Sequence, residues 1–291
     1  MISERLVSIR SQYEAGKFVT IAGPCSVDSE RLAQITIEQA KAIDIGIIRL
    51  DLFKPRTDPY DANGKLVFVG AQEEGFPWMR MALQQGIVPA TEVMMPDQAK
   101  AVIDSVRGIP GARVVLWNGA RDTNQEVLKG IGKVVGEEEE VAVEYLIKCP
   151  WAEDGKAWRG SVNWARVGGA RLEQLSMCYS GVVNNELMEK GDRRHRNWKW
   201  ALEKRIADIP MFFDPSHIGY KSERIFELTN EALHHPFDGT LLEVHPYKDG
   251  IVLNGELFND PSQTDEGIPW YAVDELDRHG HKLFRKVGAL V

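Results

Sequence analysis

The sequence predicts a (β/α)8 TIM barrel, formed by one domain over residues 1–291. Short apolar runs alternate along the chain with amphipathic segments. The runs are almost continuously apolar, which is typical of parallel strands buried on both faces. An open dinucleotide-binding sheet is the alternative, but no G-x-G-x-x-G motif follows the first run. We therefore expect a closed barrel.

Eight runs are expected to be strands, and the segments between them helices. In chain order the strands are Val19–Pro24, Gly46–Asp51, Val88–Met94, Arg113–Gly119, Val143–Lys148, Gln174–Tyr179, Pro210–Pro215 and Gly239–His245. Ser29 and Ser222 are expected to be the N-caps of the helices that follow the first and seventh strands. A short helical extension is expected before the first strand, and a C-terminal tail from about residue 262.

Composition and charge restrict the possible partners. The chain is 43% apolar and 27% charged, with a formal net charge of −8, which disfavours nucleic acid and anionic membrane. It contains no apolar run of about 18 residues, as a membrane span would need. Cys25, Cys149 and Cys178 lack zinc-finger or disulfide spacing. We expect a cytoplasmic protein with no nucleic-acid or membrane partner.

The expected strand ends carry a set of reactive side chains, and barrel active sites lie at these carboxyl ends. Cys25, His217 and Glu243 are soft, borderline and hard donors that together suit a divalent transition metal. For His217, a residue in a turn before a helix is the alternative interpretation. Five cations could hold a ligand with several anionic groups: Arg49, Lys54, Arg56, Arg121 and Lys148. The set indicates chemistry on phosphorylated, carboxylated small molecules.

Seven segments, in order, carry a resemblance to a known family. They are "IAGPCSVDS", "RLDLFKPRTDP", "TEVM", "NGARDT", "LIKCP", "FFDPSHIG" and "LLEVHP". Together they resemble the 3-deoxy-7-phosphoheptulonate (DAHP) synthases, in particular the short barrel form that some bacteria fuse to chorismate mutase. The resemblance covers roughly Lys17 to Asn259. It implies the condensation of phosphoenolpyruvate with erythrose 4-phosphate, the first step of the shikimate pathway of aromatic amino acid biosynthesis, by a homo-oligomer.

The resemblance also implies roles for single residues. Cys25, His217 and Glu243 would be metal ligands, with Asn254 at the fourth position, for Mn, Fe, Co or Zn. Arg49, Lys54 and Lys148 would hold the carboxylate of phosphoenolpyruvate, and Arg121 its phosphate. The motif Lys54, Pro55, Arg56 and Thr57 would meet the aldose phosphate, and His245 would contact either the substrate or the metal ligands. Lys54, Lys148 and His217 are the expected catalytic residues.

The chain departs from the family pattern in three places. Asn254 replaces an aspartate ligand, which weakens the expected metal site, and Ser180 replaces an arginine. Leu50 and Asp51 stand where the family has small residues. Three interpretations stay open: an active synthase with rearranged ligands, a synthase for another aldose acceptor, or a weakened paralogue that binds anions. The segment Arg193–Asn197 either supplies a replacement cation or is a basic loop before the next helix.

Overall fold

The structure is a computed structural model of the 291-residue chain. It describes residues 6–55, 58, 60, 63–66, 68–152, 154–183, 192–219, 221–244, 251–253 and 256–258. Of the expected site residues, Arg56, Thr57, His245 and Asn254 lie outside this part, as does the expected C-terminal tail.

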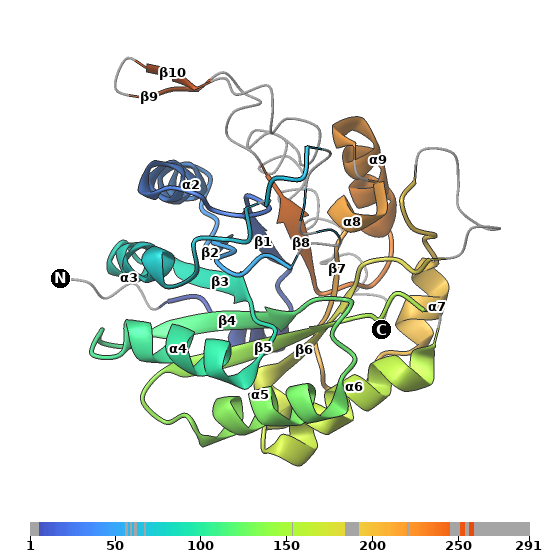
Figure 1. Ribbon diagram of the computed structural model, residues 1–291. Coiled ribbons are helices and arrows are strands. Elements are labelled where there is room, and N and C mark those ends of the chain that lie inside the picture. Colours follow the sequence, from blue (N-terminus) through green and yellow to red (C-terminus); the bar gives the residue numbers. More distant parts are fainter. Residues whose placement is uncertain are drawn as a thin grey trace.

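Eight parallel strands form a closed barrel, in which β1 pairs with both β2 and β8 (Figure 1). The strands are β1 Val19–Gly23, β2 Ile47–Arg49, β3 Val88–Glu92, β4 Arg113–Asn118, β5 Ala142–Lys148, β6 Leu175–Tyr179, β7 Met211–Phe213 and β8 Gly239–Glu243. Every end lies within two residues of its predicted position. The predicted (β/α)8 barrel is confirmed.

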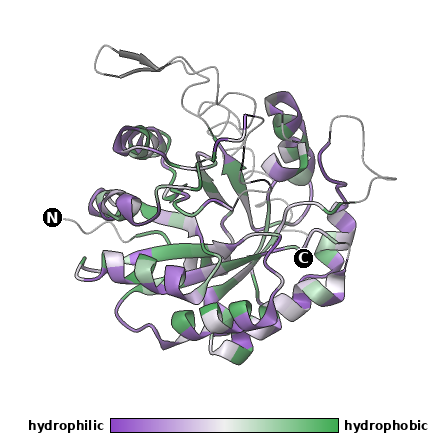
Figure 2. Cartoon of the chain, in the orientation of Figure 1, coloured by the Kyte–Doolittle hydropathy of each residue, from purple (hydrophilic) through white to green (hydrophobic). Residues whose placement is uncertain are grey.

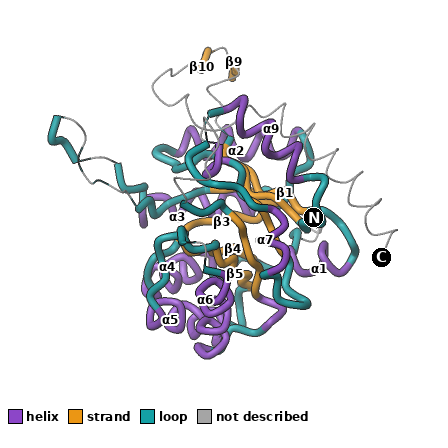
Figure 3. The backbone as a smooth tube through the Cα atoms, turned by 90° about the vertical axis from the view of Figure 1, so that its right-hand side faces the viewer, coloured by secondary structure: helices purple, strands orange, loops and turns teal. Residues whose placement is uncertain are grey.

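Helices surround the strands, as the tube view shows (Figure 3). They are α1 Ile9–Glu14, α2 Glu30–Ala42, α3 Phe76–Gln84, α4 Pro96–Val106, α5 Gln125–Glu137, α6 Gly155–Gly168, α7 Trp198–Glu203, α8 Ser216–Gly219 and α9 Ser222–Ala232, with 3-10 turns η1 Gln72–Gly75 and η2 Leu172–Gln174. Two further strands, β9 Ile251–Leu253 and β10 Glu256–Phe258, pair antiparallel to each other. Within the described residues, no helix is long and apolar enough to cross a membrane.

The two predicted helix caps have different outcomes. The side chain of Ser29 accepts a hydrogen bond from Leu32 N at 3.3 Å, so this N-cap is confirmed. The prediction for Ser222 is wrong, because α9 begins at Ser222 itself and Lys221 occupies the N-cap without a side-chain hydrogen bond. Lys221 has the extended backbone that is usual at an N-cap, but its side chain has no acceptor for the free amides of the first turn.

Apolar side chains fill the barrel and the space between barrel and helices, and the strands are correspondingly green in Figure 2. Trp117 and Phe212 lie fully buried inside the barrel. The amino-terminal end of the barrel is closed by the start of α1. There the buried Glu144 accepts hydrogen bonds from Ser8 Oγ at 2.9 Å and from Ile9 N at 3.1 Å. The predicted N-terminal helix therefore lies at the end opposite the expected site.

Candidate active site

A cavity of about 300 Å³ lies at the carboxyl ends of the strands. Its lining residues are Cys25, Lys54, Pro55, Asp58, Glu92, Gly119, Ala120, Arg121, Lys148, Trp151, Arg193, Arg194 and His217. The structure thus brings together six of the predicted site residues: Cys25, Lys54, Pro55, Arg121, Lys148 and His217. Five of the lining side chains are cationic and two are carboxylic acids, so the described walls favour an anionic ligand.

The Asp-Pro-Ser-His motif after β7 organises one side of this cavity. Asp214 is fully buried, and its Oδ2 lies 2.8 Å from both Lys148 Nζ and His217 Nδ1. Its Oδ1 accepts a hydrogen bond from His217 N at 3.3 Å, which fixes the first turn of α8. Burial opposes ionisation of Asp214, but His217 and Lys148 outweigh it and hold its pKa well below the usual range. One carboxylate therefore orients a lysine and a histidine at the cavity wall.

The serine of the same motif connects α8 with the next strand. Ser216 Oγ accepts a hydrogen bond from Glu243 N at 2.9 Å, so the motif also fixes the end of β8. His217 Nε2 then lies 3.7 Å from Glu243 Oε1. The motif therefore both forms the turn before α9 and positions side chains of the site. His217 can accordingly be a turn residue and a site residue at the same time.

Cys25, His217 and Glu243 fit a divalent metal by donor type. Burial lowers the pKa of His217 to about 4, so its imidazole is neutral at pH 7, as a metal ligand must be. Asp214 lies next to Nδ1 of His217, and Nε2 of the same ring faces Glu243. Metal-binding histidines commonly have a carboxylate at the ring nitrogen that does not bind the metal. Among the residues that the structure describes, however, no three His, Cys, Asp or Glu side chains are grouped closely enough to hold a metal. The metal site therefore stays a prediction.

Arg49 lies beneath the cavity rather than on its wall. It is fully buried, and its Nη2 lies 3.2 Å from Glu243 Oε1 and 3.3 Å from Asp51 Oδ2. Its guanidinium stacks over Trp117 at 5.1 Å from the ring centroid. Its Nε and Nη1 have no hydrogen-bond acceptor among the described residues. Burial by itself lowers the pKa of Arg49, but Glu243 and Asp51 outweigh it and raise that pKa.

Asp51, one of the departures from the family pattern, neutralises part of the cation set. It is fully buried, and its Oδ2 lies 3.8 Å from Lys54 Nζ as well as close to Arg49. Its Oδ1 accepts a hydrogen bond from Glu92 N at 2.9 Å. Burial raises the pKa of Asp51 although Lys54 and Arg49 oppose the shift. The residue holds its neighbours in place and also competes with any anion for the same two cations.

Glu92 lies on the cavity wall, and the predicted set of site residues did not include it. It ends β3 and is 6% exposed. Burial, followed by the nearby charge of Asp51, raises the pKa of Glu92 to about 7. This carboxyl group therefore exchanges a proton near neutral pH. Its position at a strand end in the segment "TEVM" was the available signal.

Arg194 and Trp151 were also missed as site residues. Arg194 lies in the segment that follows β6 and is 5% exposed. Its Nη1 donates hydrogen bonds to the backbone oxygen of Ser180 at 2.9 Å and to Ser180 Oγ at 3.0 Å. The indole ring of Trp151 forms cation–π contacts with two arginines. The guanidinium carbon of Arg121 lies 4.9 Å from the ring centroid, and that of Arg194 lies 5.3 Å from it. The signal for Arg194 was the basic segment noted above, for which two interpretations were open.

Comparisons with known proteins agree with the barrel and its motifs. No protein-family model matches the chain. A phospho-2-dehydro-3-deoxyheptonate aldolase of Thermotoga maritima is 25% identical over 250 residues, covering 83% of this chain. The chain spans 65% of the length of that relative.

Two solved structures share the fold, each with a TM-score of 0.71 and 22% identity over 94% of this chain. One is the DAHP synthase of Thermotoga maritima, of which 70% is covered. The other is a truncated form of the same organism's enzyme, of which 89% is covered. In sequence and in fold, the chain is therefore similar to the DAHP synthases of Thermotoga maritima.

Proposed function

We propose that this protein condenses phosphoenolpyruvate with erythrose 4-phosphate to give 3-deoxy-7-phosphoheptulonate and phosphate. The observation that carries the proposal is the cation-lined cavity at the strand ends, in which Lys54, Arg121, Lys148 and His217 meet. These residues come from four of the family's motifs, and the Thermotoga maritima relative bears the name of this activity. Assembly into a homo-oligomer is expected from the family resemblance.

The described residues have distinct tasks in this reaction. Lys54, Lys148 and Arg121 would neutralise the carboxylate and phosphate groups and hold the substrates together, which lowers the entropic cost of the reaction. Beneath these residues, Arg49 offers two buried nitrogen donors that have no acceptor in the described part of the chain. The methylene carbon of phosphoenolpyruvate forms a bond to the aldehyde carbon. Water adds at C2, and phosphate then leaves with cleavage of its bond to C2.

Two groups on the walls of the cavity can take part in the proton transfers of these steps. The aldehyde oxygen gains a proton as the carbon–carbon bond forms, and Lys148, held by Asp214 at 2.8 Å, is the donor we assign. Glu92, with its pKa raised to about 7 by burial and by Asp51, can take a proton from the water that adds at C2. The two groups lie on the walls of one cavity, as these roles require.

A divalent metal is part of the proposal, and Cys25, His217 and Glu243 would hold it with the residue at position 254. When bound, it would supply Lewis acidity toward the aldehyde oxygen. The neutral imidazole of His217 and the lowered pKa of Glu243 support these two as ligands. Burial alone would raise the pKa of Glu243, but His217 and then Arg49 outweigh it and lower that pKa to about 2.

The test is phosphate release from phosphoenolpyruvate by the purified protein with Mn²⁺, with and without erythrose 4-phosphate. We expect release that requires the aldose phosphate, and a product whose mass equals both substrates plus water minus phosphate. Lys148→Ala should abolish release, whereas Lys129→Ala, on the exposed face of α5, should not change it. Release without the aldose phosphate, or no release with any metal, would refute the proposal.

A further inference from the structure

We propose that Arg194 is a phosphate-binding residue of this site, and that with Arg121 it clamps one phosphate group of the ligand. The inference rests on the proposed function and names a residue that replaces the cation missing at position 180. It depends on the placement of Arg194, on its burial without an ion pair to any described carboxylate, and on the local structure that holds it.

Arg194 reaches the position where the family pattern has an arginine side chain. Ser180 directly follows β6 and is fully buried. Both its backbone oxygen and its Oγ accept hydrogen bonds from Arg194 Nη1, at 2.9 and 3.0 Å. A cation that has disappeared from the strand end is thus replaced by one from the loop fourteen positions later in the chain. Ser180 itself provides no charge at this position, but its hydroxyl group holds the guanidinium of Arg194 there.

The guanidinium of Arg194 is buried, and within the described part of the chain its contacts include no ion pair. It is 5% exposed and lines the cavity, yet no carboxylate of the described residues forms an ion pair with it. Burial lowers the pKa of Arg194 to about 10; the nearby charge of Asp214 opposes this shift, whereas Arg193 and Arg121 add to it. A buried charge that lacks a counterion is costly. A dianionic phosphate in the cavity would remove that cost.

Arg121 and Arg194 share one aromatic ring. Both guanidinium carbons lie about 5 Å from the ring centroid of Trp151, at 4.9 and 5.3 Å. Both residues line the same cavity, and the charge of Arg121 lies near enough to lower the pKa of Arg194. Two guanidinium groups arranged in this way suit the several oxygens of a phosphate better than the two of a carboxylate.

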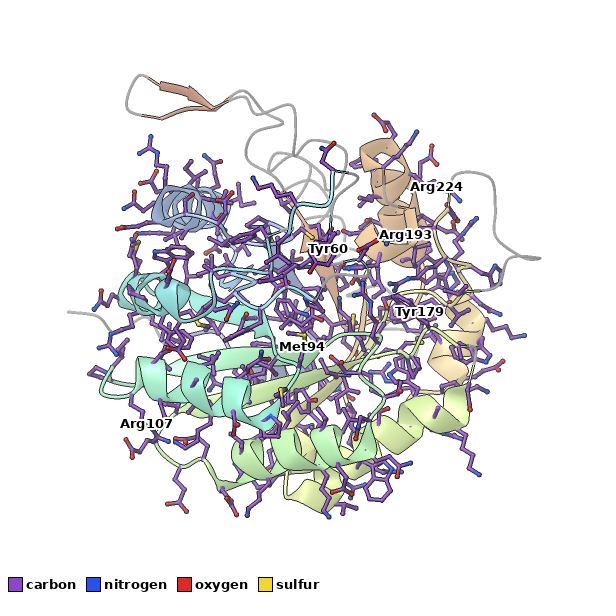
Figure 4. All side chains as sticks on the ribbon, in the orientation of Figure 1. Tyr60, Met94, Arg107, Tyr179, Arg193 and Arg224 are labelled. Carbon is purple, nitrogen blue, oxygen red and sulfur yellow. The ribbon has the colours of Figure 1, made fainter. Side chains whose placement is uncertain are left out.

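The loop that carries Arg194 is held in place from both sides. Val182 and His195 exchange backbone hydrogen bonds at 3.1 and 2.8 Å, which closes the loop at its base. The buried Asp192 forms an ion pair with Arg224 Nε at 2.5 Å and Nη2 at 3.1 Å, and Arg193 N donates to Ile218 O of α8. Figure 4 labels Arg193 beside α8 and Arg224 on α9.

Gly181 allows the loop to come this close to the strand end. It has φ of +73°, and a Cβ at this position would lie 2.9 Å from the Cβ of Arg194 and 2.8 Å from Ile218. A side chain at residue 181 would therefore displace Arg194 from Ser180. The sequence Ser-Gly after β6 thus makes room for an arginine that comes from elsewhere in the chain.

The test compares ligand binding by variants that each remove one positive charge. Arg194→Gln should bind phosphoenolpyruvate and inorganic phosphate at least about tenfold more weakly than wild type in calorimetry. Pyruvate, which lacks the phosphate, should bind both proteins equally. Arg166→Gln, on the exposed surface of α6 and not part of the cavity lining, should change phosphate affinity less than about threefold because solvent screens its charge.

A second variant separates loss of the phosphate contact from loss of structure. In Ser180→Arg/Arg194→Ser the cation returns to the strand end, and phosphate affinity should recover to within about threefold of wild type. The inference is overturned if Arg194→Gln binds phosphate as tightly as wild type, if pyruvate binding falls equally, or if wild type binds no phosphate. The proposed function fails separately, if the ligands bind but no phosphate is released.

Discussion

Removing the charge of Asp51 should strengthen anion binding while it weakens the fold. In Asp51→Asn the shape is kept, and the amide oxygen can still accept the hydrogen bond from Glu92 N. An anion bound to Lys54 Nζ would lie within about 7 Å of Asp51 Oδ2, since Nζ is 3.8 Å from that oxygen and a hydrogen bond adds about 3 Å. At an effective dielectric constant of about 20, this repulsion is about 2 kcal/mol.

We therefore expect phosphoenolpyruvate to bind Asp51→Asn about thirtyfold more tightly than wild type, since about 1.4 kcal/mol corresponds to a factor of ten. The free energy of unfolding without ligand should fall by about 3 kcal/mol, because Arg49 and Lys54 lose a buried partner. Saturating ligand should restore part of this loss. Calorimetry at pH 8 measures the affinity, and urea unfolding with and without ligand measures the stability.

Asp58→Asn is the matched control. Asp58 also lines the cavity and accepts a backbone hydrogen bond, from Tyr60 N at 3.0 Å, but it is exposed at the rim. Its loss should change affinity less than about threefold, because solvent screens its charge. If Asp51→Asn binds no more tightly than wild type, or if Asp58→Asn gains as much, Asp51 does not compete with the ligand and the reasoning is refuted.

Three further outcomes follow from the site. The pKa of Glu92 is raised to about 7, so the folded state holds this proton more tightly than the unfolded state. The free energy of unfolding, measured by urea unfolding, and the affinity for anions, measured by calorimetry, should therefore both fall as pH rises from about 4.5 through 7. Glu92→Gln should flatten both pH curves. Asp214→Asn leaves Lys148 and His217 without their shared carboxylate and should cost about 3–5 kcal/mol of stability; a loss below about 1 kcal/mol in urea unfolding would contradict the assigned role. His217→Ala should abolish binding of Mn²⁺ and Asn254→Asp should tighten it, and metal titrations in which either variant equals wild type would refute the predicted ligand set.

The local pattern of the sequence was sufficient for the barrel and for half of the site. Almost continuously apolar runs identified the strands, since parallel strands are buried on both faces. Once the strands are placed, the barrel brings their carboxyl ends together, so Cys25, Lys148 and His217 share one cavity. Ser29 was predictable as a cap for the same local reason, because its partner lies three residues away.

Only the tertiary structure decided which charges are available to a ligand. Asp51 could be recognised from the sequence as a departure, but not as the partner that occupies Arg49 and Lys54. Ser180 indicated a missing cation, and only the path of the loop shows that Arg194 returns to the same place. The sequence determined the types of group at the strand ends, because these follow from local periodicity. Their pairing depends on contacts between distant segments, which periodicity does not encode.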